Sequence, residues 1–143
     1  MYLLDTNVIS ELREPRARPA DRRVLRWAKS VPANALYLSV VSILELQLGM
    51  LQIGRRDPIQ AEILRVWIEG KILPAFAGRV LSIDLEIARR CAALHVPDPR
   101  SERDAYIAAT ALVHNMTVVT RNIADFAATG VQTLNPWEPS VVR

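Results

Sequence analysis

Five short apolar runs, separated by helical patterns, constrain the fold of this chain more than any other feature. The runs are four or five residues long, which suits a strand and is too short for a helix. They are apolar almost throughout, as in strands that pair in parallel and are covered by helices on both faces. The sequence therefore predicts an α/β fold with a central parallel five-stranded sheet flanked by helices. The predicted strands lie at residues 2–5, 36–40, 79–83, 117–120 and 131–134.

The segments between these runs carry apolar residues at helical spacing. Gly54 is expected to end one helix, and Pro58 to begin the next, which runs to about residue 73. The sequence shows no repeats, low-complexity runs or linkers, so residues 1–143 are expected to form one domain. Half of the residues are hydrophobic, which is enough to bury a core without disulfides. The predicted helices lie at 7–13, 21–30, 42–54, 58–73, 84–96, 102–115 and 122–129.

Composition also indicates a compartment and a class of partner. Cys91 is the single cysteine, and no stretch approaches the ~20 apolar residues of a membrane span. Only four residues precede Asp5, which leaves no room for a secretory signal, so a cytoplasmic location is expected. The net charge of +3 favours, weakly, a polyanionic partner such as nucleic acid. Arg22 and Arg23 belong to the densest basic patch, between residues 13 and 26, which either contacts phosphates or simply solvates a helix face.

Four acidic residues stand where the predicted sheet would gather them. Asp5 ends the first strand, Glu45 lies early in the helix after the second, and Asp125 follows the fourth. Asp104 begins the helix that leads into the fourth strand, so it should reach the same carboxyl edge, where such sheets bind ligands. The last three acids also have capping-box spacing, and singly each is more often a helix cap than a ligand. Capping does not require all of them to meet at one edge.

Crowded carboxylates predict a divalent metal. Two carboxylates ~4 Å apart repel by roughly 4 kcal/mol at an effective dielectric constant near 20. Oxygen ligands suit Mg²⁺, with Mn²⁺ as the alternative, whereas His95, His114 and Cys91 lack the spacing of a zinc site. A metal ion of this kind can activate water for phosphodiester hydrolysis, so no protein nucleophile is needed.

These motifs together resemble a known family. LLDTNVISE, SILELQLG, RDAYIAATA and TRNIADF, with GKILPAFAGRVLSID and the closing LNPW, are similar to the PIN domain of the VapC and FitB ribonuclease toxins. The resemblance covers nearly the whole chain. It implies a Mg²⁺-dependent endoribonuclease, the toxin of a type II toxin–antitoxin pair. It further implies a homodimer that a cognate antitoxin neutralises, with operator DNA bound only through that antitoxin.

The resemblance also implies roles for single residues. Asp5 and Asp104 match the metal-binding aspartates, and Glu45 matches the third acid. Thr6 matches a hydroxyl that supports the first aspartate.

The fourth acidic position remains open between Asn122 and Asp125. Asp125 is either an outer-sphere member of the metal site or only a helix cap. Arg121 is either a phosphate contact or the partner of a salt bridge within the site.

The main alternative is a PIN-like module that binds RNA or a protein partner without cutting. The presence of all four acids favours an active enzyme. A response-regulator receiver would need a lysine beyond the last strand, where neither Lys29 nor Lys71 lies. The stretches ILELQLGMLQI and AEILRVWIEGKIL carry apolar residues on more than one helix face, which predicts that a dimer partner or an antitoxin covers them. The sequence specifies neither the RNA that is cut, nor the number of metal ions, nor the antitoxin.

Overall fold

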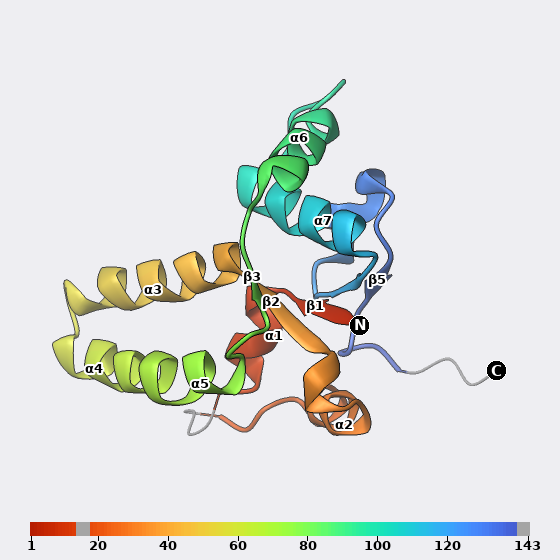
Figure 1. Ribbon diagram of the computed structural model, residues 1–143. Helices are drawn as coiled ribbons and strands as arrows, with labels where there is room; N and C mark the ends of the chain where they lie inside the picture. The colour runs from red at the N-terminus through yellow and green to blue at the C-terminus, as the bar shows by residue number, and fades with distance from the viewer. Residues whose placement is uncertain (14–17, 140–143) are drawn as a thin grey trace.

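Five parallel strands form the sheet that the sequence predicts, in the order β3-β2-β1-β4-β5. The computed structural model describes residues 1–13 and 18–139 (Figure 1), so Arg16 of the basic patch lies outside the described residues. The prediction of an α/β fold with a parallel five-stranded sheet is confirmed. The strands are β1 (Tyr2–Leu4), β2 (Leu36–Ser39), β3 (Val80–Leu81), β4 (Thr117–Val119) and β5 (Thr133–Leu134).

The strand register places the two central strand ends side by side. Leu4 of β1 pairs with Val119 of β4, and the backbone N–H of Asp5 donates to the carbonyl oxygen of Val119 at 2.9 Å. Consequently Asp5 and Thr120 leave the sheet together at its carboxyl edge. The side chains of Leu4 and Val119 are fully buried, so the position of this edge is fixed by the core.

Helices cover both faces of the sheet, and most begin and end near their predicted bounds. The predicted helix at 58–73 is divided into α4, a π-helical turn and α5. The segment at 122–129 is a 3-10 helix that ends before Gly130, whose positive φ of 81° suits glycine. The α-helices are α1 (Thr6–Glu11), α2 (Arg22–Ser30), α3 (Val40–Gly54), α4 (Pro58–Trp67), α5 (Leu73–Ala75), α6 (Leu85–Leu94) and α7 (Glu102–His114), and the others are η1 (Ala33–Ala35), η2 (Ile68–Ile72) and η3 (Ile123–Thr129).

Small side chains let α7 pack closely on the sheet. Ala105, Ala108, Ala109 and Ala111 are fully buried, and Ala108 and Ala111 belong to the core cluster that contains Leu3 of β1. A larger side chain at these positions would push the helix outward, at a cost of about 1–3 kcal/mol. The close approach matters for function because the first turn of α7 carries Asp104.

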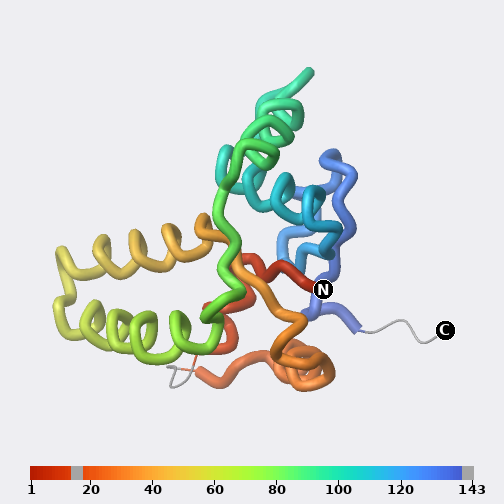
Figure 2. The backbone as a smooth tube through the Cα atoms, viewed as in Figure 1, coloured from red at the N-terminus to blue at the C-terminus, as the bar shows by residue number. Residues whose placement is uncertain are grey.

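The antiparallel pair α3 and α4, hereafter the α3–α4 hairpin, projects to one side of the sheet (Figures 1 and 2). One side of it packs into the core, through Leu46 and Met50 of α3. It also exposes large apolar side chains, as the sequence pattern predicts for helices with more than one apolar face. These are Leu44, Leu51, Ile59, Ile63 and Val66, of which Ile59 is 77% exposed. Among the described helices, none is long and apolar enough to cross a bilayer.

Candidate acidic site

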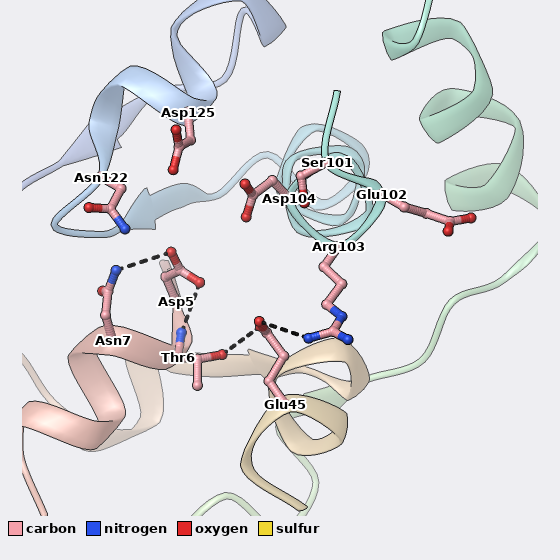
Figure 3. Close-up of a pocket in the computed structure, with 10 residues that line it drawn as sticks. All are labelled: Asp5, Thr6, Asn7, Glu45, Ser101, Glu102, Arg103, Asp104, Asn122 and Asp125. Carbon is pink, nitrogen blue, oxygen red and sulfur yellow. Dashed lines mark hydrogen bonds and ion pairs between the residues drawn. The ribbon is translucent and has the colours of Figure 1, made fainter. Parts of the chain in front are cut away.

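The carboxyl edge of the sheet opens into a polar pocket with a volume of about 530 Å³ (Figure 3). All four acids singled out in the sequence line it, although they come from four separate segments of the chain. Asp104 and Asp125 point toward Asp5 from the side of the pocket opposite α1. The lining residues are Asp5, Thr6, Asn7, Glu45, Ser101, Glu102, Arg103, Asp104, Asn122 and Asp125.

Asp5 is the most buried of the four acids, with 7% of its surface exposed. Its carboxylate accepts hydrogen bonds from the backbone N–H of Thr6 at 2.9 Å and from the hydroxyl of Thr120 at 2.8 Å. Burial raises the pKa of Asp5, these two hydrogen bonds oppose the rise, and the charges of Glu45 and Asp125 add to it. The carboxylate is therefore held in a fixed position at an electrostatic cost.

Sequence reasoning missed Thr120. The signal that could have found it is the pairing of β1 with β4, which places the residue after β4 beside the residue after β1. Asn7 completes this contact: its Nδ2 lies 3.5 Å from Asp5 Oδ2 and 3.4 Å from Thr120 Oγ1.

Thr6 positions Glu45 with its hydroxyl, contrary to the role that the resemblance implied. Its Oγ1 donates to Glu45 Oε1 at 2.8 Å, whereas only its backbone N–H supports Asp5. The physical reason is the helical start: Asp5 is the N-cap of α1, so it accepts from a backbone N–H, which leaves the threonine hydroxyl free to reach α3.

Arg103 is the second residue that the sequence analysis missed. Its Nη1 lies 3.8 Å from Glu45 Oε2, and its side chain is 49% exposed at the rim of the pocket. It occupies the first turn of α7 next to Asp104, and that adjacency was the available signal. Glu45 is thus held between a hydroxyl and a guanidinium group.

Asp104 carries the strongest electrostatic signature of the site. Its pKa rises to about 6, first because of burial and then because of the charges of Asp5, Asp125 and Glu45. A carboxyl group with this pKa is half-protonated near pH 6. A cation bound nearby would favour its charged form and lower this pKa.

The capping-box interpretation of Glu45, Asp104 and Asp125 finds little support. Ser101 and Asn122, the residues before α7 and η3, make no side-chain capping hydrogen bond. Ser39, not Ser42, caps α3, because its Oγ accepts from the backbone N–H of Val41 at 3.0 Å. Ser42 is buried inside α3, and its hydroxyl has no partner among the described residues. Glu45 therefore lies beyond the first turn of its helix and does not belong to a capping box.

Both candidates for the fourth position line the pocket. The backbone N–H of Asn122 donates to Thr120 Oγ1 at 3.0 Å, which ties the start of η3 to the hydroxyl that holds Asp5. Asp125 is the charged member, and its carboxylate contributes to the raised pKa values of Asp5 and Asp104.

The donor set of the pocket is chemically suited to a hard divalent cation. It consists of carboxylate, hydroxyl and amide oxygens, which Mg²⁺ and Mn²⁺ prefer, and a cation would relieve the repulsion among the acids. Within the described residues, however, no three His, Cys, Asp or Glu side chains lie close enough together to hold one ion.

The three arginines proposed as substrate contacts lie outside the lining of the pocket. The Arg121 guanidinium lies over the ring of Trp137, with its Cζ 5.2 Å from the ring centroid, and no ion pair in the described part of the chain joins it to an acid. Arg23 Nη1 donates to the carbonyl oxygen of Trp137 at 3.1 Å. Arg22 is exposed on the same helix.

The family model of the PIN domain matches residues 2–131 of the chain. This chain belongs to the PIN-domain family. Its PIN domain is similar to a protein named VapC ribonuclease Y4jK, from Sinorhizobium fredii (strain NBRC 101917 / NGR234). The two are 43% identical over 147 aligned positions, which cover 98% of this chain and 100% of the relative. It is also 39% identical to Toxin FitB from Neisseria gonorrhoeae (strain ATCC 700825 / FA 1090), over 96% of this chain and 99% of that protein.

Solved structures show the same fold. The PIN domain superposes on a chain of the structure titled "Structure of FitAB bound to IR36 DNA fragment" with a TM-score of 0.87 and 36% identity, and 100% of each chain is covered. It also matches a chain of the "Toxin-antitoxin complex from Klebsiella pneumoniae" with a TM-score of 0.68 and 26% identity, over 97% of this chain and 100% of that one. The resemblance to the VapC and FitB toxins is thereby confirmed.

Proposed function

We propose that this PIN domain, over residues 1–143, is a Mg²⁺-dependent endoribonuclease and the toxin of a type II toxin–antitoxin pair. The observation that carries the proposal is the pocket at the sheet edge, where four carboxylates from separate segments face one another. Burial, and after it the charges of the neighbouring acids, raise the pKa values of Asp5 and Asp104, as expected of a site that is completed by a cation. The relative named VapC ribonuclease, similar over its full length, supports the reaction class.

In this proposal Asp5, Glu45 and Asp104 hold the metal, and Asp125 binds it directly or through water. When bound, Mg²⁺ would supply Lewis acidity and an activated water for attack on the phosphodiester. Thr120 and the backbone N–H of Thr6 keep the Asp5 carboxylate oriented.

The Thr6 hydroxyl and Arg103 hold Glu45 from two sides in the same proposal. Because the Arg103 side chain lies at the rim, it can turn from Glu45 to a substrate phosphate without leaving the pocket.

A protein partner is the second part of the proposal. The similar chains belong to the FitAB structure, which is bound to a DNA fragment, and to a toxin–antitoxin complex. The α3–α4 hairpin exposes Leu44, Leu51 and Ile63, an apolar surface that a second copy of the chain or an antitoxin helix would bury. We propose a homodimer neutralised in the cytoplasm by a cognate antitoxin, with operator DNA bound only through the antitoxin.

One observation favours the alternative of a catalytically silent PIN-like module: no three of the described acids lie close enough together to hold one ion. The deciding experiment is cleavage of total bacterial RNA by the purified protein in MgCl₂ and in EDTA, with Asp104→Asn as the inactive variant. Glu86→Gln is the matched control, because Glu86 is a first-turn acid of another helix, α6.

Cleavage in MgCl₂ that EDTA and Asp104→Asn both abolish would support the enzyme. Cleavage that persists in Asp104→Asn would refute the metal assignment. RNA binding without cleavage by the wild type in MgCl₂ or MnCl₂ would favour the silent module.

A further inference from the structure

Helix α2 meets two segments near the C-terminus, about 100 residues further along the chain, beside the acidic pocket. The three segments are the turn after β4, which carries Arg121, helix α2, which carries Arg23, and the C-terminal turn, which carries Trp137. Figure 2 shows α2 and the C-terminal segment on the same side of the molecule. Arg121, Trp137 and Arg23 are hereafter the Trp137 platform.

The contacts of the platform hold the Arg121 guanidinium over the ring of Trp137. Arg121 Cζ lies 5.2 Å from the centroid of the Trp137 ring, and Trp137 packs in turn against the core cluster that contains Leu4. Arg23 Nη1 donates to the Trp137 carbonyl oxygen at 3.1 Å, so the turn is attached to α2. The guanidinium therefore lies over an indole that the core supports, and Arg121 is at the same time exposed to solvent.

The platform is joined directly to the acidic pocket. The backbone N–H of Arg121 donates to Asn7 Oδ1 at 3.3 Å, and Asn135 Nδ2 donates to the Arg121 carbonyl oxygen at 3.3 Å. Asn7 and Asn122, the neighbours of Arg121 in space and in sequence, both line the pocket. A strand whose phosphate occupied the pocket would thus meet Arg121 next.

We propose that the Trp137 platform binds the single-stranded RNA that leads into the pocket. An unpaired base stacks on the outer face of the Arg121 guanidinium, and Arg23 with the exposed Arg22 neutralises the adjacent phosphates. The proposal rests on the proposed function, since it identifies the path of the substrate of the same site.

Charge and shape favour RNA over an acidic protein segment. Positive charge is in excess here, because α2 and Arg121 carry five basic side chains and the acids beside them are Asp21, Glu11, which accepts from the Asp21 backbone N–H at 2.8 Å, and Glu138. The basic residues are Arg22, Arg23, Arg26, Lys29 and Arg121. Carboxylates need only the positive charge, whereas an exposed guanidinium that lies over an indole can also stack with a planar group such as a base. A base within a duplex is already stacked on both faces, which favours a single strand.

The test measures binding without cleavage. Fluorescence anisotropy with a short, labelled, mixed-sequence single-stranded RNA, in EDTA and at several salt concentrations, compares the wild type with Arg121→Ala, Arg121→Lys and Arg23→Ala. Arg55→Ala is the matched control, because Arg55 is an exposed arginine at the far end of the α3–α4 hairpin. Thermal unfolding is recorded for each variant, and cleavage in MgCl₂ is assayed separately.

We expect Arg121→Ala to weaken binding on the order of tenfold, the scale of one lost base stack. Arg23→Ala should lower the slope of log affinity against log salt by about 0.7, the value for one phosphate contact on a single strand. Arg121→Lys should keep the salt slope but lose affinity, because it keeps the charge and loses the planar group. Arg55→Ala should match the wild type.

Three results would overturn the proposal. One is unchanged RNA affinity and salt slope in the platform variants with only a lower melting temperature, which would make the platform a clamp for the C-terminal turn. Another is full affinity in Arg121→Lys, which would exclude stacking. The third is equal affinity for a polyglutamate of matching charge, lost in the same variants, which would indicate a surface for acidic proteins. Because binding is read in EDTA, a wild type that fails to cleave RNA would overturn the proposed function and leave this result readable.

Discussion

The acidic pocket and the packing interface between α7 and the sheet share the first turns of α7, yet they depend on opposite kinds of interaction. Asp104 faces other carboxylates, and burial and their charges raise its pKa to about 6. Ala105, Ala108 and Ala109 are fully buried and allow the helix to approach its neighbours closely. The apolar contacts supply free energy that the gathered charges partly cancel. The difference indicates that stability and activity reside in separate layers of one helix.

Asp104→Asn tests this separation most severely. RNA cleavage should fall on the order of 100-fold or more, because one of the proposed metal ligands loses its charge. The free energy of unfolding in EDTA near neutral pH should rise by about 1 kcal/mol, since a like charge leaves the cluster. Chemical denaturation and the cleavage assay measure the two effects, with Glu86→Gln as control. A variant that loses activity and stability together would break the comparison.

The other acids should follow in a graded order. Asp5→Ala should match Asp104→Asn in activity, and Glu45→Gln should be nearly as damaging, because it loses charge while keeping shape. Asp125→Asn should have the mildest effect, since Asn122 lies nearby in the same pocket. Initial cleavage rates at saturating Mg²⁺ rank the variants. A loss in Asp125→Asn equal to that of Asp5→Ala would make Asp125 a direct ligand.

Ala108→Leu should show the reverse of Asp104→Asn, with a loss of stability and little change in activity. The extra carbons have no space between α7 and the sheet, so the free energy of unfolding should fall by about 1–3 kcal/mol. The same change at the exposed Ala92 of α6 is the control and should be nearly neutral. Cleavage per folded molecule should change much less than in Asp104→Asn. A fully stable Ala108→Leu variant would show that the interface is looser than its burial implies.

The pH dependence of unfolding should distinguish the acidic pocket from the packed alanines of α7 again, with a smaller effect. Asp104 binds its proton more tightly in the folded state, so its contribution to stability is complete below its ordinary pKa and is lost as pH rises through about 6. Unfolding in EDTA between pH 4 and 7 should show a larger loss in the wild type than in Asp104→Asn, in which Asp5, whose pKa burial also raises, still contributes. Mg²⁺ should restore stability more strongly at pH 7 than at pH 5. Identical pH profiles for the two proteins would exclude Asp104 as the titrating group.

Arg103→Ala should have the smallest effect on stability. Its contact with Glu45 is 3.8 Å long and the side chain is 49% exposed, so the free energy of unfolding should change by less than about 1 kcal/mol. If Arg103 turns to the substrate phosphate, KM should rise while kcat stays close to that of the wild type. Steady-state cleavage kinetics measure both, and Arg90→Ala on α6 is an exposed control. A loss confined to kcat would instead assign Arg103 to orienting Glu45.

Local sequence patterns were sufficient for the order of the elements and for the convergence of the four acids. Short apolar runs form strands that helices cover on both faces. An acid placed just after such a strand lies at the carboxyl edge of the sheet. The same reasoning overstated capping, because spacing alone does not show whether Ser42 or Ser39 begins α3. The assignment of the Thr6 hydroxyl to Asp5 came from the family resemblance, whereas the structure pairs that hydroxyl with Glu45.

The sequence by itself determined that this chain folds as a parallel α/β domain with an acidic edge, because alternation of strands and helices and the position of acids after strands are local properties. Only the tertiary structure decided which side chains hold the acids. Thr120 reaches Asp5 across 115 residues of chain, and Thr6 reaches Glu45 across 39. The Trp137 platform likewise exists only because the C-terminal turn packs beside α2 and the turn after β4. Such partners depend on strand register and helix packing, which arise from the free energy of the whole core and not from any one motif.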